Sequence, residues 1–251
     1  QMDKARVSIV AIAIGVALVV SSSYTLGLFE GVEHMLEDLL VSAKPVSTDV
    51  IILAIDDLSL QRIGQWPWPR EIFARALSLL EKNPPQVVGV DVIFSETSGR
   101  GDADDAILHD TLKTLSYPVV FPAEASPLLL PTNELQQAGS SLRPLSLFTK
   151  LKQVALGHVN LILDRDGIVR KFPAEVVFYD SGQEKKIRAF GYEILKQGAY
   201  QIPDEETLGV IPRIVYAAPA GSIRSISFSR LLAEGGEAGK IAKEGLQRLS
   251  E

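Results

Sequence analysis

An uncharged apolar segment near the N-terminus constrains this chain more than any other feature. Residues 7–29 carry no charged side chain, and as a helix they are long enough to cross the roughly 30 Å hydrocarbon core of a membrane. Lys4 and Arg6 precede this transmembrane segment and acidic residues follow it. The positive-inside bias therefore places residues 1–6 in the cytoplasm and the main domain outside, periplasmic or extracellular, on the cell inner membrane.

The same segment also fits a cleaved signal peptide. Residues 7–20 form a plausible hydrophobic core, and Ser21, Ser22 and Ser23 offer small residues for cleavage. The apolar run resumes at Leu26, which favours a retained anchor. Both readings export the rest of the chain.

Apolar residues recur at helical spacing through residues 30–45, where Pro45 ends a predicted juxtamembrane helix. Some of them also fit a heptad seam: Leu28, Val32, Met35 and Leu39. Pairing of this seam with a second copy would make a homodimer and a path for a signal across the bilayer. The alternative is that the apolar stripe packs on its own domain, because coiled coils normally need three or four heptads.

Composition excludes several classes of protein. The 251 residues carry a formal net charge of -6, which argues against a surface that neutralises phosphates, so nucleic acid is not an expected partner. The chain has no cysteine, which removes disulfides, thiolate metal sites and thiol nucleophiles together. The 46% of hydrophobic residues can form one sizeable core.

The pattern after the anchor is typical of an α/β domain. Residues 49–57 and 87–94 are near-continuous aliphatic runs, which predict strands buried on both faces of a sheet. Between them, Pro69 opens a helix that residues 82–85 close, so residues 49–94 are expected to form a right-handed, parallel βαβ unit. A helix over 102–115 and a strand over 118–121 follow. Residues 122–147 are expected to be a long irregular excursion with a short helix near 134–138.

The second half of the chain predicts antiparallel strands. These cover residues 154–163, 168–172 and 176–179, with a turn at Asp166-Gly167. A helix over 189–196, a strand over 214–216 and a strand-to-helix segment over 226–232 complete the expected elements. The fold class is therefore an N-terminal transmembrane helix followed by an α/β sandwich with a parallel βαβ start and an antiparallel hairpin extension.

Several segments resemble the CHASE2 family of extracytoplasmic sensor domains. They read AIDDLSLQRIGQWPWPRE, VGVDVIFSE, GDADDAILHDTL and GHVNLILDRDGIVRKFP, in the family's order and spacing. The resemblance covers roughly residues 33–232 and is most specific at Trp66-Pro67-Trp68-Pro69-Arg70. It implies a sensory input module, with the sensor domain over residues 46–235. The output, a nucleotide cyclase, a diguanylate cyclase or a kinase in the cytoplasm, is absent from this sequence.

The C-terminal end departs from the family pattern. Members follow Gly-Lys-Ile with an apolar strand and further membrane spans, whereas here Gly239-Lys240-Ile241 runs into the polar sequence Ala242-Lys243-Glu244-Gly245. Residues 236–251 are therefore expected to be a helical segment cut before a final strand, and the sequence to be a fragment of a longer receptor.

Acidic residues mark one candidate ligand site. Asp56 and Asp57 end one predicted strand and Asp91 lies in its predicted neighbour, near the carboxyl ends where open α/β sheets bind ligands. Three carboxylates there suit Mg²⁺ or a cationic ligand, and with one Asp as nucleophile they would suit a metal-dependent hydrolase. Alternatively, Asp57 and Ser59 only cap the following turn. No catalytic residue is assigned.

An aromatic segment marks the second candidate. Prolines stiffen the chain around Trp66 and Trp68, which suits a ligand wall or, equally, a plug over the edge of the sheet. Arg70 is placed to pair with Asp56 or Asp57 in a bidentate contact. Residues Asp56, Asp57, Ser59, Trp66, Trp68, Arg70 and Asp91 form the predicted ligand-binding set.

No cofactor or metal is expected. The three histidines lack zinc-type spacing, and Asp164-Arg165-Asp166-Gly167 lacks the later acidic positions of a calcium loop. The expected partner of the exported domain is an unknown small-molecule or protein stimulus, and a constitutive protein-interaction module is the third reading.

Overall fold

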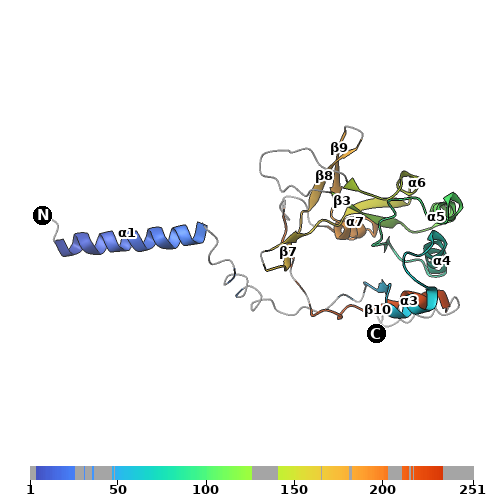
Figure 1. The fold of residues 1–251 in the computed structure, drawn as a ribbon, viewed down its shortest axis with the longest axis horizontal. Coiled ribbons are helices and arrows are strands. Elements are labelled where there is room, and N and C mark those ends of the chain that lie inside the picture. The colour runs from blue at the N-terminus through green and yellow to red at the C-terminus, as the bar shows by residue number, and fades with distance from the viewer. Residues whose placement is uncertain are drawn as a thin grey trace. The chain divides into compact units, whose positions relative to one another are not determined.

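A computed structural model describes residues 4–25, 31, 36, 47, 49–125, 141–164, 166–180, 183–202, 211–214, 216 and 218–233. The chain divides into two units, residues 1–46 with 215–219 and residues 47–214 with 220–251. The functional residues discussed below all lie in the second unit, whose elements are labelled in Figure 1.

The first unit contains helix α1 (Lys4–Thr25). Its stretch Ser8–Thr25 has a mean hydropathy of 1.9 and no buried residue, and it is the one described helix long and apolar enough to cross a membrane. Ile9, Ile12 and Val19 are about two-thirds exposed. A helix that is apolar all round needs an apolar environment. The expected N-terminal apolar helix is confirmed, whereas the juxtamembrane helix lies almost entirely outside the described residues.

A parallel sheet forms the centre of the second unit. Strand β3 (Val119–Ala125) lies between β2 (Val88–Gly89) and β5 (Val154–His158) and is parallel to both. The short β4 (Ser141–Leu142) adds an antiparallel pair at the end of β3. Helix α5 (Asp102–Thr114) connects β2 to β3, so these three elements make the parallel βαβ unit of the domain.

Helices cover both faces of this sheet. Helices α4 (Arg70–Leu80), α5 and α6 (Ser146–Thr149) enclose the main core with the side chains that alternate along one face of β3. Helix α7 (Phe190–Gln197) packs on β5, β3 and β2, and it approaches the sheet most closely at Gly157 of β5 and Gly89 of β2. The largest fully buried apolar side chains of the core are Phe94, Phe121, Phe148, Leu108 and Leu112. Periodic apolar positions and N-terminal acidic residues predicted α4 and α5 closely.

The strand expected over residues 49–57 differs from its prediction in its partner and in its burial. Strand β1 (Ile52–Ala54) pairs in parallel with β10 (Ser225–Ser227), not with the strand at 88–89. Val50 and Ile52 are about half exposed, so the aliphatic run is not buried on both faces. The expected βαβ unit over 49–94 is therefore wrong in its pairing. An aliphatic run predicts a strand, but its partner depends on residues 170 positions away.

The antiparallel part of the fold consists of two separate hairpins. Strands β6 (Ile162–Leu163) and β7 (Val169–Lys171) flank the predicted turn, in which Gly167 has a φ of 80°. Strands β8 (Glu175–Asp180) and β9 (Gln183–Arg188) form the second hairpin. The sequence did not predict β9, because its charged residues break the apolar alternation, and it wrongly joined β5 to β6 as one antiparallel strand.

The remaining expectations have mixed outcomes. The predicted helix over 189–196 is α7, and the segment over 226–232 is β10 followed by α9 (Phe228–Ala233). The strand expected over 214–216 is reduced to a single bridge between Lys171 and Arg213. The end of β3 and the short β4 fall inside the expected irregular excursion, and α6 begins at its end. The short helix at 134–138 and the segment 236–251 lie outside the described residues.

Candidate functional site

A cluster of hydroxyl groups joins the carboxyl ends of β1 and β10. Asp56 is the N-terminal cap of α3 (Asp57–Ile63), a helix that the sequence did not predict. Its Oδ1 accepts hydrogen bonds from the Ser59 backbone N–H at 2.8 Å, from Ser59 Oγ at 2.6 Å and from Ser227 Oγ at 2.9 Å. As an alternative to ligand binding, the sequence predicted that Asp57 caps the following turn. In the structure Asp56 makes this cap instead.

Ser59 is the centre of this cluster. Its side chain is fully buried, lies 3.0 Å from Ser227 Oγ, and accepts a hydrogen bond from the Ser229 backbone N–H at 3.0 Å. The hydrogen bond from the Ser59 hydroxyl is the main reason why the pKa of Asp56 is lowered, and it outweighs the opposite effect of burial. Asp56 therefore stays ionised, and the cluster ties α3 to α9.

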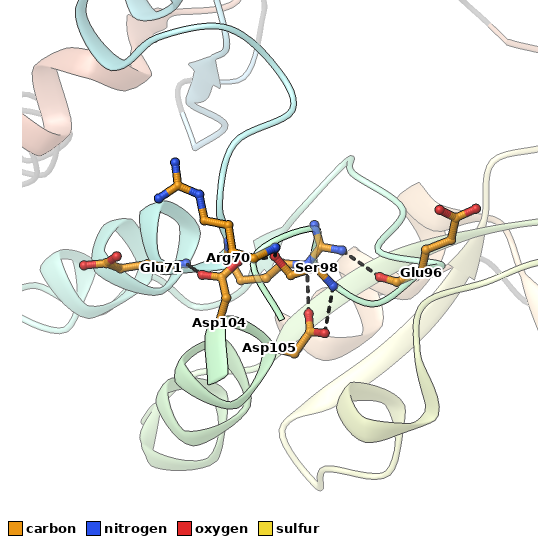
Figure 2. A network of polar contacts seen from close by, with 7 residues as sticks. Arg70, Glu71, Glu96, Ser98, Asp104 and Asp105 are labelled. Atoms are coloured by element: carbon orange, nitrogen blue, oxygen red, sulfur yellow. Dashed lines mark hydrogen bonds and ion pairs between the residues drawn. The ribbon is translucent and has the colours of Figure 1, made fainter. Parts of the chain in front are cut away.

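A second polar cluster joins the N-terminal ends of two helices (Figure 2). Asp104 in the first turn of α5 accepts the backbone N–H of Arg70 at 2.8 Å and that of Glu71 at 3.0 Å, which are the first amides of α4. These amides have no partner inside their own helix. Pro69, at the cap position of α4, provides no side-chain acceptor, so Asp104 caps α4 from a different helix.

The Arg70 side chain completes the cluster. Its Nε lies 3.1 Å from Asp105 Oδ1, its Nη2 donates to the Glu96 carbonyl at 2.8 Å, and its guanidinium carbon lies 4.3 Å from the centre of the Phe94 ring. Ser98 holds the loop between β2 and α5, since its N–H donates to Asp105 Oδ2 at 2.9 Å and its hydroxyl to Asp104 Oδ2. We call Arg70, Ser98, Asp104 and Asp105 the Arg70 cluster.

Electrostatics keep Asp104 of the Arg70 cluster ionised. Burial by itself raises the pKa of Asp104, but the hydrogen bond from Ser98, the two backbone amides and the positive charge of Arg70 together lower it. The carboxylate oxygens thus bind protein donors and hold three segments in place. Such an arrangement fixes geometry, and it differs from a catalytic acid or base, which needs a proton that it can exchange with a substrate.

The structure separates the residues of the predicted ligand-binding set. Arg70 pairs with Asp105, so the expected pairing with Asp56 or Asp57 is wrong. The sequence shows the acidic first turn of α5, at Asp102, Asp104 and Asp105, but not that it contacts Arg70. Asp57 and Asp91 are exposed. Among the residues that the structure describes, no three His, Cys, Asp or Glu side chains form a group that could hold a metal ion.

The two tryptophans differ in their environment. Trp68 is only 3% exposed, packs 5.4 Å from Phe228 between ring centres, and donates its indole N–H to the Gly64 carbonyl at 2.7 Å. Trp66 is 40% exposed and packs edge-on against Trp68 at 5.5 Å. Trp68 is therefore part of the core, and Trp66 is the member of the pair that a ligand can reach.

Comparison with known protein families gives one match. A family model described as the CHASE2 domain matches residues 11–246, which is nearly the whole sequence. No curated protein and no solved structure matches it.

Proposed function

The chain belongs to the CHASE2 domain family, a family of extracellular sensory domains of receptors, and from that premise we propose that it is the sensory input module of a bacterial transmembrane receptor. The observation that carries the proposal is the extent of the match, which includes the apolar helix α1 together with the α/β domain. The domain binds a small-molecule or protein stimulus outside the cytoplasm and passes it to a cytoplasmic cyclase or kinase output.

The proposed mechanism is a shift between two arrangements of paired anchor helices in a homodimer. A stimulus that binds one arrangement more tightly increases its population, and the shift cannot exceed the difference between its two affinities. Sensing of this kind needs a domain that transmits a local change to its N-terminal end without chemistry of its own.

The polar clusters support a sensory role over an enzymatic one. The Ser59 hydroxyl is bound to a carboxylate, as in an activated nucleophile, but it is fully buried, so a substrate cannot reach it. In the Arg70 cluster the carboxylates of Asp104 and Asp105 are both buried and already accept protein donors. Both clusters hold helix starts in place, which favours a rigid module that moves as a unit.

The orientation of the proposed receptor can be tested by labelling single cysteines. The 251 residues contain no cysteine, so each single-cysteine variant adds one thiol to this part of the receptor. Ser146→Cys places it at an exposed position on α6, and Lys4→Cys places it at the start of α1. In cells with a permeabilised outer membrane, a membrane-impermeant maleimide should label position 146 and not position 4. Both thiols should react after lysis with detergent.

The unmodified full-length receptor, labelled in parallel, serves as the control for thiols elsewhere in the protein. Labelling of position 4 but not position 146 in intact cells would place the domain in the cytoplasm and contradict the proposal. Loss of the N-terminal cysteine from the mature protein, detected by its mass, would show that the apolar segment is cleaved.

A further inference from the structure

A buried histidine lies where three segments of the domain meet. His158 is the last residue of β5 and is 2% exposed. It forms a parallel bridge with Ala189, directly before α7, and its register partner on β3 is Ala123. Ala123 belongs to a small apolar cluster that the β8–β9 hairpin completes through Val176 and Ile187. His158 thus sits between the central sheet and this hairpin.

Neither ring nitrogen of His158 has a hydrogen-bond partner among the described residues. Buried polar groups are normally paired, because an unpaired one loses its hydrogen bonds to water without replacement. Asn160, two residues further along the chain, illustrates the usual solution: its side chain donates to the Ala125 carbonyl at 2.7 Å and accepts the Ala125 N–H at 3.0 Å. His158 is buried without such pairing, and the fold as described gives it no structural task.

Protonation of the buried His158 ring is energetically unfavourable. Burial lowers the pKa of His158 to about 4, and the nearby backbone of Pro173 and Ala174 opposes this effect only in part. A charged imidazolium has two N–H donors and no acceptor. Because burial outweighs the backbone of Pro173 and Ala174, the charged ring is favoured in an opened state in which water reaches it.

Charged neighbours do not compensate the histidine. On β3, Glu124 follows the register partner of His158 and therefore points to the opposite face of the sheet. On α7, buried Glu193 accepts a hydrogen bond from Gln197 at 2.7 Å, and Arg188 of β9 lies 3.3 Å from Glu175 of β8. Helix α6 has no titratable residue. The remaining titratable side chains described on these elements are Tyr192, Lys196, Lys185 and Lys186.

We propose that His158 makes this domain acid-responsive: uptake of a proton by its ring separates the β8–β9 hairpin from the end of β5. The role of the proton as a stimulus rests on the proposed sensory function, whereas the movement of the hairpin does not. The movement is confined to one junction, because no described residue of the β8–β9 hairpin belongs to the main core or to the Arg70 cluster.

Hydrogen exchange on the full-length receptor in detergent or nanodiscs tests the movement. Amides of residues 174–177 and 185–189, including the Ala189 N–H that donates to the Ala174 carbonyl at 2.9 Å, are the reporters. After correction for intrinsic exchange, their protection should fall about 50-fold between about pH 7 and about pH 4.5, since an opened state in which His158 has its ordinary pKa binds the proton more tightly.

The His158→Leu variant should keep its protection at both pH values. His109→Gln is the matched control, because His109 is partly exposed on α5 beside Asp110, and it should behave like the wild type. Equal protection of the wild-type reporters at the two pH values overturns the proposal. If His158→Leu does not fold, an NMR titration of the wild-type imidazole replaces it, and an ordinary pKa near 6.5 overturns the proposal in the same way.

The signalling part has its own readout in cells. Receptor output should differ between neutral and acidic medium in the wild type and in His109→Gln, and not in His158→Leu. If the receptor responds to another stimulus while the exchange protection of its hairpin amides does not change with pH, the role of His158 is contradicted and the sensory function is not. A receptor whose output responds to no condition contradicts the sensory function itself.

Discussion

Asp104 and Asp105 are adjacent in the sequence but stabilise different parts of the molecule. Asp104 caps α4, while Asp105 binds the Arg70 side chain and the Ser98 amide. Both carboxylates are buried, with Asp105 only 2% exposed, so protein donors must replace the water that each would otherwise bind. Removal of one donor therefore leaves a buried charge unpaired, which costs more than an isolated surface ion pair contributes.

Replacement of Arg70 should destabilise the domain as a whole. In Arg70→Gln the carboxylate of Asp105 loses its charged partner, and we expect a loss of about 3 kcal/mol in the free energy of unfolding, as for other broken buried pairs. For a domain of this size the melting temperature should fall by roughly 10 °C. Thermal unfolding of the solubilised chain, followed by near-ultraviolet circular dichroism, measures the effect.

The matched control is Arg100→Gln, because the Arg100 residue is exposed and only its backbone amide contacts Ser98. This variant should unfold within about 0.5 kcal/mol of the wild type. A normal melting temperature for Arg70→Gln combined with lost signalling would assign Arg70 to stimulus binding instead of folding.

At the scale of elements, two glycines set the distance between α7 and the sheet. A Cβ built on Gly157 of β5 would lie 2.5 Å from the Phe190 Cα, and one built on Gly89 of β2 would overlap the end of the Ile194 side chain. The contact at Gly157 is with backbone, which cannot rotate away as a side chain can. Helix α7 can therefore approach β5 this closely only because residue 157 has no side chain.

Substitution of Gly157 should weaken the contact between α7 and β5. We expect Gly157→Ala to cost about 1–3 kcal/mol, the usual cost of overpacking, and to speed hydrogen exchange in α7. The control is Gly191→Ala within α7, where an added Cβ meets nothing within 4 Å. Because alanine is the better helix former, this control should be stabilised by up to about 1 kcal/mol. Equal stability of the two variants would contradict the close packing.

The helices of this domain were easier to predict than its strand pairings. Apolar periodicity and terminal signals located α4, α5 and α7 within a few residues, because these determinants are local. The partner of β1 is a segment about 170 residues away, and no local pattern distinguishes β10 from β2 in that role. Helix α3 was missed because it has only seven residues and begins only two residues after β1, inside the segment predicted as a strand.

The sequence singled out several residues of the two polar clusters but not the partners that they contact. Asp56, Ser59 and Arg70 were predicted to bind a ligand, with a structural role as the alternative, and Arg70 was expected to pair with Asp56 or Asp57. Their partners in the structure include Ser227 and Asp105, which lie in segments that the sequence pattern assigned to other tasks. His158 was considered only as a metal ligand. Its burial between β5 and the hairpin depends on tertiary packing, which spacing along the chain does not contain.

At the scale of the whole molecule, signalling requires a change in the exported domain to alter the anchor. Helix α1 carries no charged residue from Ser8 to Thr25, and the sequence after it predicts an amphipathic helix with a heptad seam. A seam shared by two copies has discrete registers, so a small change in the domain can select one of them. Residues 32–39 are the segment where such a change should be visible.

Cysteine cross-linking along residues 32–39 of the full-length receptor in native membranes tests this directly. With a pyridyl disulfide oxidant that works in acid, dimers should form at positions three or four residues apart, as expected for one face of a helix. Between about pH 7 and about pH 4.5 the strongest positions should change, and the change should be absent in the His158→Leu background. The same pattern at both pH values and with every other stimulus tried would describe a constitutive interaction module, since an anchor with one arrangement has no second state for a signal to select.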